Sequence, residues 1–311
     1  MNSLPNPMKM ECRVSKRGAL VELAGLLAPR QGYNPTALAG VRLLRTETVL
    51  HDVPVLYKPG AVFVLQGRKQ GMLDGEVYLY DEEHYLAVSV PVPFRMESSA
   101  SAERPLLAVY VEFDMLLAAE IASEVGMRRS EPKAGKVRSL VSSRMEAAIE
   151  DVVLRLLRAL CDPVELAVLG AGILRELHYR VLVGPQGGAM ISALQQRGTS
   201  GRIVRSLARL RETYGSEISV AALAHEAGMS VPSYHVHFKA LTGSSPIQYL
   251  KAMRLHEARL MLARQDKTIA EVATLVGYAS PAQFSRDFKR HFRRTASEEA
   301  NWVRRHLGEL A

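Results

Sequence analysis

The chain has 311 residues, 48% of them hydrophobic and 23% charged, which is the composition of an ordinary globular protein of about two domains. No apolar run reaches the roughly 18 residues that a membrane-spanning helix needs, and the N-terminus lacks the apolar stretch of a secretion signal. We therefore expect a cytoplasmic protein with no membrane partner. The two cysteines, Cys12 and Cys161, provide neither a disulfide framework nor a metal-ligand spacing.

The net charge of +8 is concentrated in the last third of the chain. From position 202 onward there are 17 Lys and Arg against 10 Asp and Glu, a net charge of +7, whereas the first 201 residues hold 23 against 22. Basic charge gathered in one segment favours a polyanionic partner, because neutralised phosphates release counterions. A solvated basic surface would have the same composition, so the charge indicates nucleic-acid binding only together with a structural motif that binds nucleic acid.

Residues 49–113 are predicted to form strands. They are rich in Val, Tyr, Leu and Phe, they alternate in places, and they are divided by Gly, Pro and Asp, as in a small barrel or sandwich. If the strands enclose an interior, five aromatic residues could line a site for a small, partly hydrophobic effector, although alternation would leave about half of them in the core or at the surface. These candidates are Tyr57, Phe63, Tyr78, Tyr80 and Tyr85. The stretch has no His-x-His pair with a following Glu, so we expect no metal site and no cofactor.

Residues 114–183 are predicted to be helical. Apolar side chains recur at helical spacing between Ile149 and Leu160, and again between Leu166 and Val181. Such stripes are more often core than dimer interface, but a partner helix could pack here. Glycines then cluster at 184–201 and predict a linker. The sequence thus divides into a sensing and dimerisation domain at 1–183, the linker at 184–201, and a helical domain at 202–311.

A short motif occurs twice in the helical domain. In the first copy, "AGMSVPSYHVHFK", Ser219 and Ser230 are expected to cap two helices, Gly228 makes the turn between them, and Tyr234 and Phe238 lie four apart on a buried face. Two short helices joined by such a turn form a helix-turn-helix. One copy could be a chance helical hairpin.

The second copy, "VGYASPAQFSRDFK", follows about fifty residues later. Thr268 and Glu271 have capping-box spacing, Gly277 matches the earlier turn glycine, and Phe284 and Phe288 match the earlier aromatic pair. Two matched copies point strongly to DNA binding.

Between the copies, Ser245 and Pro246 are expected to start a helix of about 18 residues, roughly 27 Å long. A rod of this length could hold two recognition helices close to the ~34 Å repeat of the major groove on one duplex. The outward-facing positions of the two helices are then the candidate DNA contacts. They are Ser230, Pro232, Ser233, His235, Val236 and Lys239 in the first copy, and Ser280, Ala282, Gln283, Ser285, Arg286, Lys289 and Arg290 in the second. Among them, Arg286 suits guanine and Gln283 adenine, whereas Lys239, Lys289 and Arg290 suit phosphates.

At these residues the last 110 positions resemble the DNA-binding domain of the AraC/XylS family of transcription regulators. The stretches "RLHEARLML" and "IAEVATLVGYASPAQFSRDFKRHF" are similar to the family signature, and "VLQGRKQ" and "RELHYRVLVGPQG" resemble the N-terminal domain of one subgroup. The resemblance implies an α+β protein, in which a cupin-like β-barrel with a helical dimerisation segment precedes an all-α domain carrying two helix-turn-helix motifs on a long helix. It also implies a homodimer that senses a small molecule, binds double-stranded DNA and often activates transcription by touching RNA polymerase.

Two positions depart from the family pattern. Val236 stands where the family commonly has an arginine, which predicts that the first recognition helix is less directed to guanine and depends more on His235. "FRRTASEE" from Phe292 stands where a glycine and a proline are usual, which leaves the end of the second recognition helix open and adds Arg293 and Arg294 as possible phosphate contacts.

Two other classes of function make different demands on the sequence. A DNA-repair alkyltransferase fused to such a domain would need a four-cysteine zinc site and a nucleophilic cysteine, which two cysteines cannot supply, and no Gly-x-Ser-x-Gly elbow is present. We therefore expect no enzyme. An effector-independent repressor or architectural protein, whose barrel serves only for dimerisation, stays open beside an effector-responsive activator.

Overall fold

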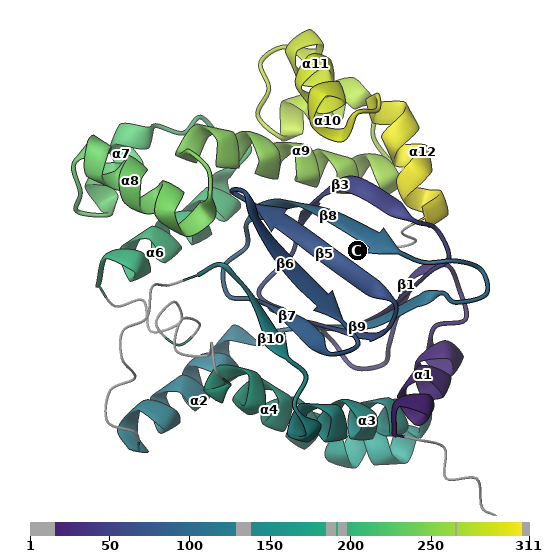
Figure 1. Cartoon of the computed structure of the whole chain (residues 1–311). Helices are drawn as coiled ribbons and strands as arrows, with labels where there is room; N and C mark the ends of the chain where they lie inside the picture. Colours follow the sequence, from purple (N-terminus) through teal and green to yellow (C-terminus); the bar gives the residue numbers. More distant parts are fainter. Residues whose placement is uncertain (1–15, 129–137, 185–190, 192–197, 265, 307–311) are drawn as a thin grey trace, which may run out of the picture.

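The computed structural model describes residues 16–128, 138–184, 191, 198–264 and 266–306 (Figure 1). The N-terminal part is one antiparallel sheet of ten strands, in the order β1-β2-β9-β4-β7-β6-β5-β8-β3, with β10 paired to β7. The strands are β1 (Gly32–Pro35), β2 (Val41–Thr46), β3 (Leu50–Leu56), β4 (Gly60–Gln66), β5 (Arg68–Leu73), β6 (Glu76–Asp81), β7 (His84–Val88), β8 (Pro93–Ser99), β9 (Leu106–Glu112) and β10 (Leu140–Arg144). The sheet curls into a half-barrel, so the expected fold class is confirmed.

The strand region is wider than the sequence predicted. β1 and β2 precede position 49, and β10 lies in the stretch expected to be helical. Short or charged strands such as these lack the long apolar pattern from which the central strands were predicted.

Four helices cover the outer face of the sheet, as Figure 1 shows at the bottom of the view. They are α1 (Lys16–Leu27), α2 (Met115–Arg128), α3 (Ala147–Cys161) and α4 (Pro163–Val183). The predicted apolar stripe of α3, including Val152 and Leu156, is buried in this layer together with Phe63 and Val109 of the sheet. α3 therefore belongs to the core of its own chain.

The α3–α4 junction shows how local sequence places these helices. The Asp162 side chain accepts hydrogen bonds from the backbone N–H groups of Val164 (2.8 Å) and Glu165 (3.2 Å), and Pro163 occupies the first helical turn. An aspartate cap followed by proline is the expected start of a helix, because the aspartate accepts from free N–H groups of the first turn and the proline has no N–H to satisfy. Of the helices that the described residues form, none combines the length and apolar character that crossing a bilayer requires.

The C-terminal part is entirely helical. It comprises α6 (Gly198–Thr213), α7 (Val220–Glu226), α8 (Val231–Thr242), α9 (Pro246–Arg264), α10 (Ile269–Leu275), α11 (Pro281–Phe292) and α12 (Ala296–His306). Most of the predicted linker at 184–201 falls outside the described residues, so the proposed domain boundaries stay a prediction.

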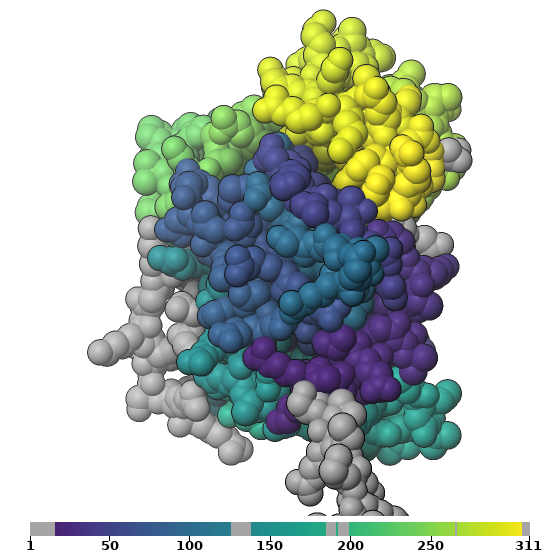
Figure 2. Space-filling model, turned by 45° about the vertical axis from the view of Figure 1, so that its right-hand side comes forward, coloured from purple at the N-terminus to yellow at the C-terminus, as the bar shows by residue number. Residues whose placement is uncertain are grey.

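The helical part packs directly on the half-barrel. α9 lies against β3 and β8, and Figure 2 shows the green and yellow helices resting on the blue strands. The Tyr249 hydroxyl donates to the backbone oxygen of Pro91 (2.8 Å), and Arg259 Nη1 donates to that of Pro54 (3.0 Å). The inner face of the sheet and α6 to α9 share one hydrophobic cluster, so the two parts have a continuous core.

Candidate nucleic-acid interface

The first helix-turn-helix is formed by α7 and α8. The Ser219 hydroxyl accepts from Ala222 N (3.3 Å) and that of Ser230 from Ser233 N (3.4 Å), which caps both helices as predicted. Gly228 joins them with φ +62°, a conformation that favours glycine. Tyr234 and Phe238 are fully buried with ring centroids 5.5 Å apart, so the opposite side of α8 faces outward.

The second helix-turn-helix, α10 and α11, repeats the arrangement. The capping box of Thr268 and Glu271 is present, since each side chain bonds the backbone N–H of the other residue. Gly277 has φ +83°, and a Cβ atom there would lie 2.7 Å from the Gly215 oxygen, so only glycine fits. Phe284 and Phe288 are fully buried, as expected.

The two recognition helices end differently. α8 ends at Gly243 with φ +72°, a left-handed cap that satisfies the last carbonyls. α11 ends at Arg293, which adopts the same conformation at φ +62° without being glycine. The departure seen in the sequence therefore leaves the helix end intact, although the left-handed conformation is strained for a residue with a side chain.

The connecting helix α9 starts as predicted. Ser245 Oγ accepts from Gln248 N (3.3 Å), while Gln248 Oε1 accepts from Ser245 N (3.2 Å), and Pro246 occupies the first turn. With 19 residues, α9 is about 28 Å long.

Arg254 fixes α9 to the segment after α6 and to the second motif, a role that the sequence did not reveal. Its guanidinium donates to the backbone oxygens of Tyr214 (2.7 Å), Ser216 (2.8 Å) and Gly277 (2.9 Å). These acceptors lie at the end of α6 and in the turn of the second motif, so one side chain joins three segments. Partial burial lowers the pKa of Arg254, but an arginine stays charged. An arginine within a helix is usually exposed, and its spacing gives no sign of this contact.

All thirteen predicted DNA contacts are exposed or partly exposed. Val236 is 66% exposed, and Arg286 is exposed with no carboxylate paired to it among the described residues. Arg290 differs, because its guanidinium pairs with Asp287 of the same helix, and Lys251 Nζ lies 3.6 Å from that carboxylate. The Ser285 hydroxyl donates to Pro281 O (2.9 Å) within α11. Arg286 is thus freer to reach DNA than Arg290.

The five predicted effector contacts are not brought together. Tyr57, Tyr78 and Tyr80 lie in the inner cluster of the half-barrel, whereas Phe63 and Tyr85 pack on the outer face beneath the helices, 5.3 Å apart. The five candidates therefore do not line one pocket, in keeping with the expectation that about half would lie elsewhere, and effector binding by any of them stays a prediction. β4 and β7 are buried on both faces, so aromatic residues on them can point either way. The inner cluster also holds Lys69, Tyr33 and Tyr110, which the sequence did not single out.

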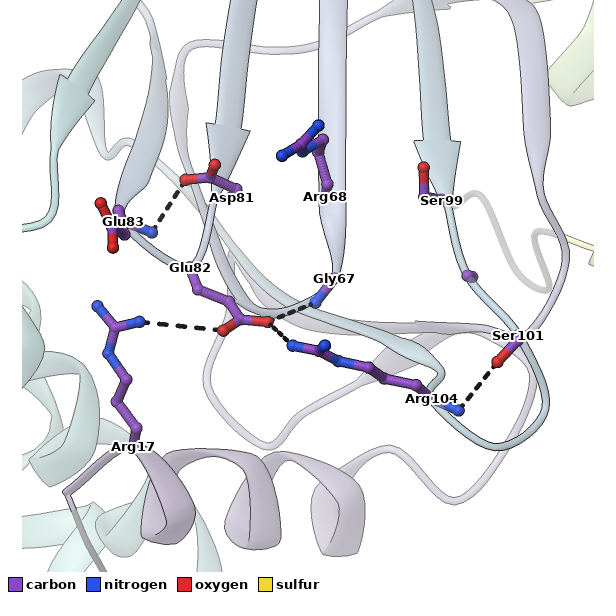
Figure 3. Close-up of a pocket in the computed structure, with 10 residues that line it drawn as sticks. Arg17, Gly67, Arg68, Asp81, Glu82, Glu83, Ser99, Ser101 and Arg104 are labelled. Carbon is purple, nitrogen blue, oxygen red and sulfur yellow. Dashed lines mark hydrogen bonds and ion pairs between the residues drawn. The ribbon is translucent and has the colours of Figure 1, made fainter.

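A cavity of about 700 Å³ opens at the end of the half-barrel beside α1 (Figure 3). Its centre is Glu82, which accepts from Gly67 N (3.1 Å) and Arg104 Nη2 (2.6 Å) and lies 3.9 Å from Arg17. These ion pairs join α1 to the strand ends, which indicates a structural role. Within the described ranges, no three His, Cys, Asp or Glu side chains come together as metal ligands would.

Comparison with known proteins agrees with this geometry. Residues 37–189 match the model of the AraC-type transcriptional regulator N-terminus, and residues 223–301 match a helix-turn-helix domain model. The chain is similar to the HTH-type transcriptional activator RhaS of Escherichia fergusonii (31% identity over 116 residues, 37% of this chain and 41% of that protein). It is also similar to that of Salmonella schwarzengrund (30% over 103 residues, 32% and 37%). The matched segments span only about two fifths of these relatives.

The whole fold has a counterpart among solved structures. ToxT from Vibrio cholerae, crystallised with an unsaturated fatty acid, superposes with a TM-score of 0.60 at 13% identity, over 90% of this chain and 99% of that one. The family models and the activator relatives describe a DNA-binding regulator and not an enzyme. The duplicated helix-turn-helix, the half-barrel before it and these matches place the chain in the AraC/XylS family of transcription regulators.

Proposed function

We propose that this regulator reads two adjacent major grooves of one duplex, responds to a small effector held by the half-barrel, and activates transcription through contact with RNA polymerase. The observation that carries the proposal is Arg254, which joins α9, the end of α6 and the turn of the second motif. With α9 about 28 Å long, the two recognition helices are mounted on one stiff support of a length close to the ~34 Å groove repeat. Activation is supported by the RhaS relatives, which are named transcriptional activators.

A homodimer formed through α4 completes the proposal. Val164 and Val168 are each 74% exposed and lie one turn apart, and Leu169 and Tyr179 add further exposed apolar surface. Apolar surface of this kind marks an association site, and a two-fold axis across α4 would place the same residues of a second copy against it. Val168→Glu should then convert a dimer into a monomer in analytical ultracentrifugation, while Val77→Glu, at an exposed strand position, should not.

Footprinting tests the two-groove reading. Sites selected in vitro with the full chain are rebuilt with the two half-site centres 10 or 15 base pairs apart. We expect tight binding and protection of two consecutive major grooves only at the 10-base-pair spacing, because 15 base pairs turn the second half-site to the opposite side of the duplex. Protection of one groove, or equal affinity at both spacings, would contradict the proposal.

A further inference from the structure

Lys69 of β5 is a buried cation without a counter-charge. Its side chain is 1% exposed, its Nζ donates to Tyr57 Oη at 3.2 Å, and the ring centroids of Tyr57 and Tyr80 lie 5.8 and 5.7 Å from that nitrogen. Across the described ranges, no Asp or Glu forms an ion pair with it. A lysine this deeply buried is rare unless it is paired, because removing the ammonium from water costs several kcal/mol.

The tyrosines around Lys69 do not supply the missing negative charge. Burial raises the pKa of Tyr33 and of Tyr57 to about 12 and raises that of Tyr80 well above its ordinary value, so all three are neutral phenols at neutral pH. A neutral phenol can still donate a hydrogen bond. The Tyr80 hydroxyl is fully buried and interacts with that of Tyr57, but it makes no hydrogen bond of good geometry. An unpaired donor beside an unpaired cation is a combination that a bound acceptor would satisfy.

We propose that Lys69 and Tyr80 receive the carboxylate of a small monocarboxylic acid bound inside the half-barrel. This inference rests on the proposed function, in which the half-barrel holds a small effector, and it names the chemical class of that effector. The ammonium and the phenol would each donate to a carboxylate oxygen, and such charge-assisted hydrogen bonds are strong in an apolar setting. The remaining surface near the site is apolar and aromatic, with Phe94 edge-on to Tyr57 at 5.2 Å, which suits an aliphatic or aromatic body. Lys69 supplies one positive charge at the site, while Arg42 and Arg259 act electrostatically on the adjacent Tyr57, so inorganic phosphate is included as a competing anion in the test.

The site is connected to the DNA-binding domain. Tyr57 directly follows β3, and the backbone oxygen of Pro54 in that strand accepts from Arg259 of α9. Arg259 also interacts electrostatically with Tyr57 and Tyr33. A ligand held by Lys69 would therefore act on the same strand that supports α9.

The test measures thermal stability of the full chain with straight-chain carboxylates from acetate to decanoate, with benzoate, with the matching primary amides, and with inorganic phosphate. We expect at least one carboxylate to raise the melting temperature above the effect of its amide, and phosphate to have none. Lys69→Met keeps the side-chain length and should weaken that carboxylate by about 10- to 100-fold. Lys58→Met, at an exposed lysine paired with Glu112, is the matched control and should bind like wild type.

Tyr80→Phe provides a second variant. It removes a hydroxyl that makes no hydrogen bond of good geometry, so the protein should fold normally and bind the carboxylate several-fold more weakly. Calorimetry in buffers of different ionisation enthalpy adds an independent readout. Burial lowers the pKa of Lys69, and a bound carboxylate would raise it again, so any proton uptake seen with wild type should disappear in Lys69→Met.

Three outcomes would overturn the proposal: carboxylates no better than their amides across the series, full binding by Lys69→Met or Tyr80→Phe, or phosphate as the preferred anion. Operator affinity is measured on the same proteins without acid. If wild type and Lys69→Met both bind DNA but no carboxylate binds, only the ligand assignment fails. If wild type does not bind DNA, the proposed function fails instead.

Discussion

At the scale of single residues, Arg286 is the side chain best placed to read a base. It is exposed on α11, whereas Arg290 on the same helix is paired with Asp287. We expect Arg286→Ala to lose about 1–3 kcal/mol of binding free energy at the cognate site and to relax the preference at one base pair, because the proposed bidentate contact to guanine would be lost. Fluorescence anisotropy over a set of single-base operator variants measures both effects. Arg290→Ala serves as the control and should weaken all sequences slightly and equally; the same uniform loss for Arg286→Ala would make Arg286 a phosphate contact.

Arg293 leads to a prediction about stability. Its φ of +62° is strained for a residue with a Cβ atom, so Arg293→Gly should raise the free energy of unfolding by about 1 kcal/mol. Gly243 holds the equivalent position after α8, and a Cβ atom there would lie 2.9 Å from Leu73 Cδ1. Gly243→Ala should therefore lower the free energy of unfolding. Urea denaturation measures both changes. A stabilising Gly243→Ala or a destabilising Arg293→Gly would contradict the idea that both helix ends favour glycine.

At the scale of elements, the position of α9 depends on the Arg254 guanidinium. Arg254→Met keeps most of the aliphatic side chain but removes three hydrogen bonds to backbone oxygens, so we expect it to lower the free energy of unfolding by about 2 kcal/mol. It should also weaken binding to a two-half-site operator more than binding to a single half-site, because the spacing between the recognition helices α8 and α11 would no longer be fixed. Lys251→Met on the same helix is the control, since Lys251 makes only a longer contact to Asp287. An equal loss of affinity for the two-half-site operator and for the single half-site would show that Arg254 does not set the spacing of α8 and α11.

The elements also show what sequence can predict. Both helix-turn-helix motifs and α9 were predicted correctly, because capping serines, turn glycines and buried aromatics are local signals. β1, β2 and β10 were missed since they are short or carry charged residues, and their strand form depends on pairing with distant neighbours. The effector candidates were split between two faces because strands buried on both sides give no pattern that separates inside from outside. Arg254 and Lys69 were missed for a similar reason: their contacts are made with residues remote in sequence.

At the scale of the whole molecule, the junction between the half-barrel and the helices should be sensitive to acid. His256 and His291 lie with ring centroids 5.4 Å apart, each with a buried Nε2 atom that has no partner, and Arg95 and Arg259 face them from β8 and α9. Burial, and then these cations, lower the pKa of His291 to about 4, and burial beside His291 and the two arginines lowers that of His256 well below its ordinary value.

Because the unfolded chain has a histidine pKa of roughly 6.5, it binds protons that the folded protein excludes. Stability should therefore be unaffected by these histidines above pH 6.5 and fall as the pH decreases toward 4, by about 3 kcal/mol for His291 alone. Thermal unfolding across this range measures the effect. His291→Gln, which cannot titrate, should flatten the curve, and an unchanged slope in that variant would assign the acid sensitivity to other groups.

The packing of the helices on the half-barrel leaves every candidate DNA contact at least partly open to solvent. If an effector acts on this protein as we propose, it has no need to uncover these thirteen positions, because they are already open to solvent. Such an effector could instead change the contacts between α9 and the half-barrel, which include the hydrogen bonds of α9 to the backbone oxygens of Pro54 and Pro91. DNA affinity would then depend on whether α8 and α11, both always exposed, are spaced so that they can bind the same duplex at the same time.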